Sequence, residues 1–199
     1  MNMMTRYFLL AAVLAFVCQA AAHADADLLL NQGFETPELK DAVETGVVPS
    51  DWMVYSSVTT GAKIGLSTTV HHAGKQSVRL AVQGVGDAYQ GLLESVSVTP
   101  GTSYHFTVYV RNDDSRPLKG SARGQISIEW KDKDGREIDR RWGPDWGVAL
   151  PTGEWTKFEM TEKAPPNAVR GNFVINQFDG HDSASGVFFA DDASVTVAP

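Results

Sequence analysis

The chain has 199 residues, of which 43% are hydrophobic and 21% are charged, and its formal net charge is −7 at pH 7. This size and composition are typical of a single globular domain with a substantial apolar core. The acidic balance disfavours nucleic acids and anionic membrane surfaces as partners, because both demand clustered Lys and Arg side chains.

The first residues have the pattern of a secretory signal peptide spanning residues 1–24. Arg6 supplies a positive charge, residues 8–17 form a short apolar run, and Ala22 and Ala24 are small residues at the cleavage positions. The run is shorter than the roughly 20 apolar residues that a membrane-spanning helix needs, and no later segment approaches that length. We therefore expect a mature chain of residues 25–199 that is secreted, periplasmic or extracellular, without membrane insertion.

Cysteine usage limits how the domain can be stabilised. Cys18 is the only cysteine and lies within the predicted signal peptide. The mature domain therefore forms no internal disulfide and no thiolate metal site. The bulky Val17 before this cysteine argues against lipid attachment. The fold must rest on its core.

Short runs of alternating apolar and polar residues follow one another from Ser77 onward, and such alternation is the signature of a half-buried strand. The apolar members of these runs are Val78, Leu80 and Val82; Val96 and Val98; Tyr104, Phe106, Val108 and Val110; Ile126, Ile128 and Trp130; Trp155 and Phe158; Phe173 and Ile175; and Ala193, Val195 and Val197. Turn-forming segments such as Pro100-Gly101 and residues 132–135 separate the runs. The pattern predicts an all-β, two-sheet β-sandwich, with at most a short helical turn around residues 39–44.

Alternation also predicts which side chains face outward. If Tyr104 to Val110 point into the core at every second position, then Tyr109 and Arg111 face away from it. On later strands the same alternation predicts that five further side chains face outward: Ser127, Glu129, Asn172, Asn176 and Phe178.

Two motifs bracket the predicted domain: Asn31-Gln32-Gly33-Phe34-Glu35 near its start and Phe189-Ala190-Asp191-Asp192-Ala193-Ser194-Val195 near its end. Between them lie Pro49-Ser50-Asp51-Trp52, Gly74-Lys75-Gln76-Ser77, Thr99-Pro100-Gly101-Thr102-Ser103-Tyr104 and Gly153-Glu154-Trp155-Thr156. In this order, the motifs resemble the jelly-roll carbohydrate-binding modules found beside cellulases and xylanases, within the galactose-binding-domain-like superfamily. The resemblance covers nearly all of the mature chain and implies a jelly roll with a sugar cleft on one concave outer sheet face.

A sugar site combines exposed aromatic platforms, for the apolar C–H faces of the rings, with fixed polar groups for the hydroxyls. The resemblance brings together Tyr109, Arg111, Glu129, Asn176 and Phe178 as candidates on the concave face. Further candidate platforms are Tyr55, Tyr89, Trp142 and Trp146. Residues 140–147 contain Gly and Pro and are expected to form a loop, whose tryptophans either contact the ligand or fold back over a sheet end. Trp52, Trp130 and Trp155 are expected to be structural.

The resemblance also implies a structural calcium ion that joins the first and last strands. The matching ligands are Glu35, Asp191, the Lys75 carbonyl and the backbone around Gln32 and Gly33. Oxygen ligands of this kind are those that Ca²⁺ prefers in proteins. The alternative is that Glu35 and Asp191 only cap loops through hydrogen bonds.

These observations predict a secreted, non-catalytic and monomeric domain that binds a polysaccharide or oligosaccharide. The sequence has no nucleophile elbow, phosphate-binding loop or zinc-protease motif. Because such modules usually accompany a catalytic domain, either a partner enzyme binds noncovalently or binding itself is the function.

Two alternatives remain open. One is a structural or adhesive protein of the cell envelope that has kept the fold without the cleft. The other is a small glycosidase or polysaccharide lyase, which needs two carboxylates such as Glu129 and Asp179, or a pair such as Tyr109 and His105, in one groove.

Overall fold

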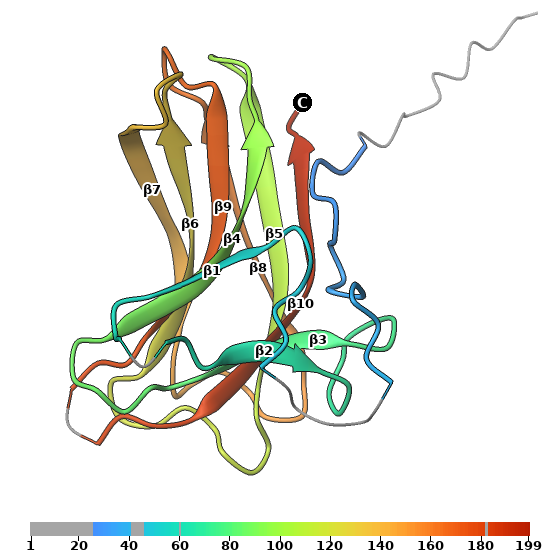
Figure 1. The fold of residues 1–199 in the computed structure, drawn as a ribbon, viewed down its shortest axis with the longest axis vertical. Coiled ribbons are helices and arrows are strands. Elements are labelled where there is room, and N and C mark those ends of the chain that lie inside the picture. The colour runs from blue at the N-terminus through green and yellow to red at the C-terminus, as the bar shows by residue number, and fades with distance from the viewer. Residues whose placement is uncertain (1–25, 41–45, 60, 182) are drawn as a thin grey trace, which may run out of the picture.

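The computed structural model describes residues 26–40, 46–59, 61–181 and 183–199. Within these residues, ten strands form two five-stranded antiparallel sheets, ordered β1-β4-β9-β6-β7 and β2-β3-β10-β5-β8 (Figure 1). The strands are β1 (Met53–Ser56), β2 (Ile64–Ser67), β3 (Ser77–Ala81), β4 (Tyr89–Ser97), β5 (Ser103–Asn112), β6 (Arg123–Lys131), β7 (Glu137–Trp146), β8 (Thr156–Lys163), β9 (Arg170–Phe178) and β10 (Val187–Val197). The predicted all-β sandwich is confirmed. The predicted signal peptide and positions 41–44 of the predicted helical turn lie outside the described residues.

The strands predicted from alternation are present, but β1, β2 and β7 are not foreseen by it. Residues 140–147 were expected to form a loop, and this is wrong, because β7 runs from Glu137 to Trp146. Its place at the edge of the sheet explains how it tolerates Pro144, since an edge strand has one side that needs no hydrogen-bonding partner. Its register with β6 also shifts opposite Pro144, between Gln125 and Ser127.

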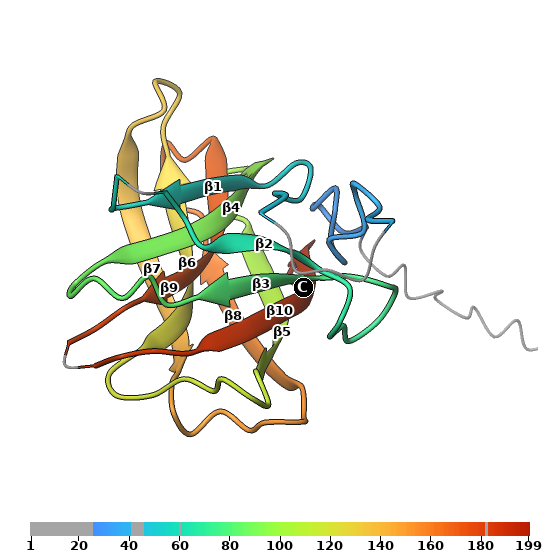
Figure 2. The same cartoon turned by 60° about the horizontal axis from the view of Figure 1, so that its bottom comes forward.

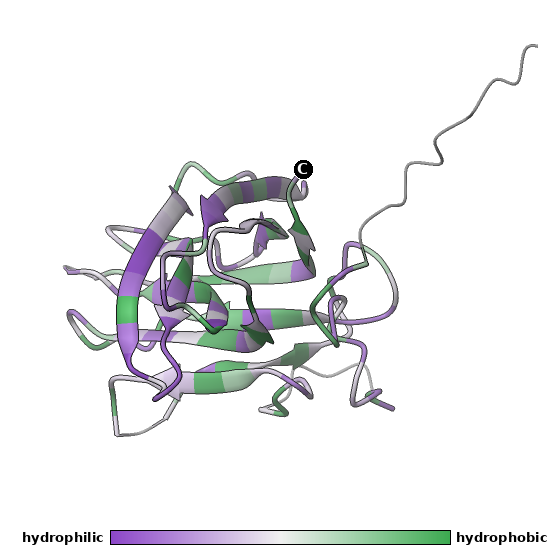
Figure 3. Cartoon of the chain, turned by 90° about the horizontal axis from the view of Figure 1, so that it is seen from above, coloured by the Kyte–Doolittle hydropathy of each residue, from purple (hydrophilic) through white to green (hydrophobic). Residues whose placement is uncertain are grey.

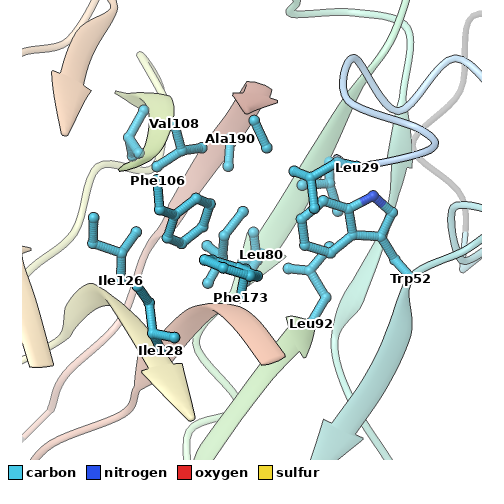
Figure 4. Close-up of a cluster of buried hydrophobic side chains, with 14 of the residues drawn as sticks. Leu29, Trp52, Leu80, Leu92, Phe106, Val108, Ile126, Ile128, Phe173 and Ala190 are labelled. Carbon is cyan, nitrogen blue, oxygen red and sulfur yellow. The ribbon is translucent and has the colours of Figure 1, made fainter. Parts of the chain in front are cut away.

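The core lies between the sheets, and its side chains alternate with outward-facing ones along each strand. Tyr104, Phe106, Val108 and Val110 are buried, as predicted. Phe173 on β9 is the centre of an aromatic cluster, with its ring centroid 5.5 Å from that of Phe106 and 6.4 Å from that of Trp130. Figure 4 shows Phe106 and Phe173 together with aliphatic side chains from both sheets. Figure 3 shows the matching alternation of hydrophobic and hydrophilic segments along the strands.

The two ends of the described domain lie side by side. The segment that begins at residue 26 follows β10 (Figures 1 and 2), and the Leu28 amide donates to the Val195 carbonyl at 2.8 Å. Trp52 is buried against Phe34, with ring centroids 5.0 Å apart, so its predicted structural role is confirmed. No segment in the described part of the chain forms an apolar helix of membrane-spanning length.

Phe173→Ala should lower the free energy of unfolding by about 3–5 kcal/mol, because it empties the centre of a fully packed aromatic cluster. Urea unfolding measures the change. Ile138→Ala, at a position that is 40% exposed, is the matched control and should cost far less. Equal losses in the two variants would contradict the central position of Phe173.

Candidate functional site

A groove of about 430 Å³ crosses the outer face of the β1-β4-β9-β6-β7 sheet. All five strands contribute to it, because alternation points every second side chain away from the core. Its lining residues are Met53, Tyr55, Tyr89, Leu93, Glu129, Lys131, Arg140, Trp142, Asn172, Asn176 and Phe178.

The strand register sets these side chains in rows across the sheet. One row runs from Tyr55 through Gly91 to Asn176. A second row pairs Asn172 with Glu129, and Glu129 with Arg140 on the edge strand. A third pairs Tyr89 with Phe178. Side chains that are far apart in the sequence therefore share one surface because the pairing of the strands fixes them there.

Aromatic side chains border the groove on both sides. The Tyr55 and Tyr89 rings, on β1 and β4, have centroids 6.4 Å apart, and Tyr89 is 50% exposed. On the other side, the Trp142 ring of β7 lies 6.1 Å from the Phe178 ring of β9 and is 49% exposed. Half-exposed rings of this size are uncommon on a soluble protein unless they contact a ligand or partner.

Polar groups form the floor between these aromatic sides. The Glu129 carboxylate is nearly buried; its Oε1 atom lies 2.7 Å from Arg140 Nη2, and its Oε2 atom lies 3.1 Å from Lys131 Nζ. Asn172 Nδ2 donates to Oε2 at 3.1 Å. Glu137 also pairs with Arg140 and Lys131, and hydrogen bonding from Arg140 holds the pKa of Glu137 below its ordinary value. The negative charges of Glu129 and Glu137 thus balance the positive charges of Arg140 and Lys131.

Asn176 is held in a fixed orientation on the floor. Its Nδ2 atom donates to the Gln125 carbonyl and to Ser127 Oγ, both at 3.0 Å, while its Oδ1 atom accepts from the Tyr55 hydroxyl at 2.5 Å. Burial raises the pKa of Tyr55, so this hydroxyl stays protonated and able to donate. Gly91 makes the arrangement possible, because a Cβ atom there would overlap the Tyr55 hydroxyl.

Six of the nine predicted sugar-site residues line this groove: Tyr55, Tyr89, Glu129, Trp142, Asn176 and Phe178. Trp146 does not. It is 5% exposed and packs inward on Phe158 and Phe188, with ring centroids 4.7 and 5.3 Å away. The expectation that it is an exposed platform is wrong. Trp146 pairs with Gly124, and the register shift between Gln125 and Ser127 places it on the opposite face of β7 from Trp142.

Tyr109 and Arg111 also lie outside the groove. Both face outward as predicted, but β5 belongs to the second sheet, so they lie on the opposite face of the sandwich. There Tyr109 stacks on His72, with ring centroids 4.0 Å apart, and Arg111 pairs with Asp114.

Trp130 is fully buried, as expected. Trp155 is only partly buried, on the same outer face near Phe189.

Four lining residues were not identified from the sequence: Met53, Leu93, Lys131 and Arg140. Met53 belongs to β1, whose four residues are too few to show alternation. Lys131 follows Ser127 and Glu129 at alternate positions of β6. The same alternation therefore predicts that its side chain faces outward. Gly91, in the interior of β4, was the available signal that another side chain approaches this strand closely.

The pairs that an enzyme would need do not meet in the groove. Asp179 is 1% exposed, and its carboxylate oxygens accept the Gln83 and Val85 amides, each at 3.0 Å, outside the groove. Glu129 is the one acidic residue among the described lining residues. His105 hydrogen-bonds with Thr161 on β8, whereas Tyr109 stacks on His72.

The predicted calcium ligands gather around one turn, residues 72–76. Asp191 Oδ2 accepts the His72 amide at 2.7 Å, and Glu35 Oε1 accepts the Lys75 amide at 2.8 Å. The strand β10 has a register shift beginning at Asp191, and the Ala193 amide beyond it donates to the Gln32 carbonyl at 2.9 Å. The two bracketing motifs therefore meet at this turn.

The oxygen-rich composition of this cluster suits a hard cation. Asp191 is fully buried, and none of the ion pairs found among the described residues involves it. Gly33 lies beside the Glu35 and Asp192 side chains. No group of three or more His, Cys, Asp or Glu residues within the described segments is arranged to hold a metal. Calcium would therefore need carbonyl oxygens as well as the two carboxylates.

A protein-family model described as a carbohydrate binding domain matches residues 26–179. No curated protein sequence matches the chain.

Several solved structures share the fold at low sequence identity. TmCBM61 in complex with β-1,4-galactotriose is 17% identical, with a TM-score of 0.55, 87% of this chain covered and 99% of that chain. The CBM22-1 xylan-binding domain of Paenibacillus barcinonensis Xyn10C is 16% identical, with a TM-score of 0.55 and coverages of 89% and 97%. The Stig cyclase FisC of Fischerella sp. TAU is 17% identical, with a TM-score of 0.62 and coverages of 87% and 97%.

Other matches are to longer chains, and the chain spans only 21% of a bacteriophage CBA120 tailspike domain. At these identities the likeness shows the fold alone.

The carboxylate of Asp191 should make the stability of the chelated protein depend on pH. Burial raises its pKa to about 7 from an ordinary 3.8, despite amide hydrogen bonds from His72, Asp192 and Ala73. The folded state then binds more protons than the unfolded state between these two values, so stability falls as the pH rises from about 4 to about 7. Urea unfolding in EDTA should show a loss of roughly 4 kcal/mol between pH 4 and pH 8.

Asp191→Asn is the comparison, because the amide does not titrate. The variant is expected to be less stable overall, since one amide hydrogen bond to Asp191 is lost, and its stability should change less over the same pH interval. An unchanged pH slope in this variant would show that another group causes the dependence.

Proposed function

Because the chain belongs to the carbohydrate-binding domain family, we propose that it binds a polysaccharide or oligosaccharide in the groove over the β1-β4-β9-β6-β7 sheet. The observation that carries this proposal is the combination of half-exposed aromatic rings on both sides with a fixed polar floor. Sugar rings present apolar C–H faces and polar hydroxyl edges, and this groove offers a partner for each.

The groove suits a chain of linked sugars. Its lining comes from all five strands, so it crosses four strand spacings, or roughly 19 Å. That length accommodates several sugar rings. TmCBM61 was solved with a galactotriose and the Paenibacillus domain is described as xylan-binding, which supports an oligosaccharide or polysaccharide ligand.

A non-catalytic role is part of the proposal. Hydrolysis of a glycosidic bond generally uses two carboxyl groups on either side of it, about 5–10 Å apart. Glu129 is the single acid among the described lining residues, and two cations already neutralise it. The exposure of Trp142 disfavours the alternative of a structural envelope protein without a cleft.

We also propose that the domain is secreted and that calcium stabilises the turn at residues 72–76. Secretion rests on the signal-peptide pattern of residues 1–24. Calcium would be held by Glu35, Asp191 and carbonyl oxygens of Lys75 and Gly33. The bound ion would supply the positive charge that the buried Asp191 lacks and would link the N-terminal motif to β10.

Glycan-array binding of residues 25–199 tests the groove. We expect binding to at least one of galactan, xylan, glucan or mannan, and Trp142→Ala should weaken it by up to about tenfold, because a stacked aromatic ring contributes about 0.5–1.5 kcal/mol. Melting should be unchanged, since Trp142 is half exposed. Trp155→Ala, on the opposite face of the sandwich, is the matched control and should bind as the parent does. Failure of the parent to bind any glycan would overturn the proposal.

Calcium is tested by thermal melting and calorimetric titration of the EDTA-treated protein. Added Ca²⁺ should raise the melting temperature, and Glu35→Gln should abolish the increase, whereas Asp134→Asn in the exposed β6–β7 turn should leave it intact. If Ca²⁺ shifts neither the parent nor the control, Glu35 and Asp191 act only by accepting backbone hydrogen bonds.

A further inference from the structure

A second cavity, of about 460 Å³, lies where β3 ends and β10 begins, two strands that run side by side in Figure 2. The segment before β2 and the loop after β5 complete its walls, and it shares no lining residue with the groove. Four of its lining residues are cationic: Lys63, Arg79, Arg116 and Lys119. None of the described lining residues is acidic, although the whole chain has a formal net charge of −7. The charge of this cavity is therefore opposite to that of the chain.

Carboxylates offset little of this positive charge. Arg116 Nη2 lies 3.5 Å from Asp113 Oδ2, which is a long distance for an ion pair. Among the ion pairs found in the described part of the chain, none involves Lys63 or Lys119. Cations around one hollow repel one another, and a bound anion would replace this repulsion with attraction. The charge of the cavity therefore fits a ligand that carries an anionic oxygen group.

The loop that carries Arg116 and Lys119 is fixed to the segment that leads into β10. The Lys119 amide donates to the Ser185 carbonyl, and the Val187 amide donates to the Arg116 carbonyl, both at 2.8 Å. Gly186 allows the two segments to lie this close, because a Cβ atom there would overlap the backbone of residues 117 and 118. This wall is therefore in place before any ligand arrives.

The opposite wall is also fixed by hydrogen bonds. Lys63 Nζ donates to the Gln83 carbonyl at 2.8 Å, and the Ala81 amide donates to the Lys63 carbonyl at 3.0 Å. Arg79 lies on β3 between its neighbours β2 and β10, so the sheet sets its position. Cationic side chains on fixed segments lower the entropic cost of binding an anion.

The remaining lining favours a charged sugar over other anions. Ser115 and Ser185 are exposed in the lining, and their hydroxyls can pair with sugar hydroxyls. Guanidinium groups bind carboxylates and sulfates through paired hydrogen bonds. A single-stranded nucleic acid would need aromatic rings for its bases, and none of the described lining residues is aromatic.

We propose that this cavity binds an anionic sugar unit, bearing a carboxylate or a sulfate, of an acidic polysaccharide. The choice of a sugar rests on the proposed function, but the site is separate from the groove. A neutral glycan would occupy the groove, and an acidic glycan would bind at this cavity.

Calorimetric titration with a galacturonate trisaccharide and with sulfated galactotriose tests the cavity. We expect saturable binding of at least one, and weaker binding when NaCl is raised from about 50 to about 300 mM, because salt screens exposed charges. Lys119→Glu should weaken binding by about tenfold, since it replaces a cation with an anion in the lining. Lys119 is exposed, so the melting temperature should not change.

Lys133→Glu is the matched control, because it changes the net charge equally on the exposed β6–β7 turn, outside this cavity. It should leave binding of the anionic probe unchanged. Equal weakening by the two lysine variants would show that net charge causes the attraction and would overturn the site. Displacement of the probe by an equal concentration of inorganic sulfate would overturn the recognition of a sugar.

One further comparison separates the cavity from the groove. Trp142→Ala should leave binding of the anionic probe unchanged, and Lys119→Glu should leave binding of a neutral glycan unchanged. Loss of the anionic probe in Trp142→Ala would place it in the groove and overturn the cavity. A parent protein that binds a neutral glycan but neither anionic probe would overturn the cavity and leave the groove proposal standing.

Discussion

The apolar layer between the two sheets is the constraint on which the rest of the structure depends. With one cysteine in the chain, no intrachain disulfide is available, so burial of side chains such as Phe106 and Phe173 supplies most of the folding free energy. Burial also fixes the register, because a slip of one residue would turn each strand's apolar set toward solvent. The groove side chains occupy the outward positions of the same strands. The register that places the core residues between the sheets therefore also fixes where the groove residues lie.

The floor of the groove is organised before any ligand is present. Glu129 is nearly buried and would be costly there if unpaired, but Arg140 and Lys131 offset the loss of hydration. Asn176 has committed both of its N–H groups to β6, which leaves its oxygen and the Tyr55 hydroxyl in one orientation. Side chains that are already ordered lose little further freedom on binding, which favours affinity for a polar ligand.

Alternation predicted the sandwich, its core positions and the outward direction of Glu129 and Asn176, because these depend only on the local period of a strand. It did not predict which outward residues share a face. Tyr109 and Asn176 both point outward, yet they lie on opposite sheets, and sheet membership depends on pairing between distant strands. The edge strand β7 was missed because Gly143 and Pro144 are read locally as a loop, whereas an edge position tolerates both.

Two glycines show how the inward or outward position of a residue on its strand determines whether the paired aromatic lies in the core or in the groove. Gly124 is paired with Trp146, and Gly91 with Tyr55, and in each pair a Cβ atom on the glycine would overlap the aromatic side chain. In both pairs, the missing Cβ atom of the glycine lets a large ring pack against the neighbouring strand. Gly124 occupies an inward position of β6, so Trp146 enters the core, whereas Gly91 occupies an outward position of β4, so Tyr55 lies on the groove. Parity along β7 alone would place Trp142 and Trp146 on the same face, and the register shift between them is what puts one in the groove and the other in the core.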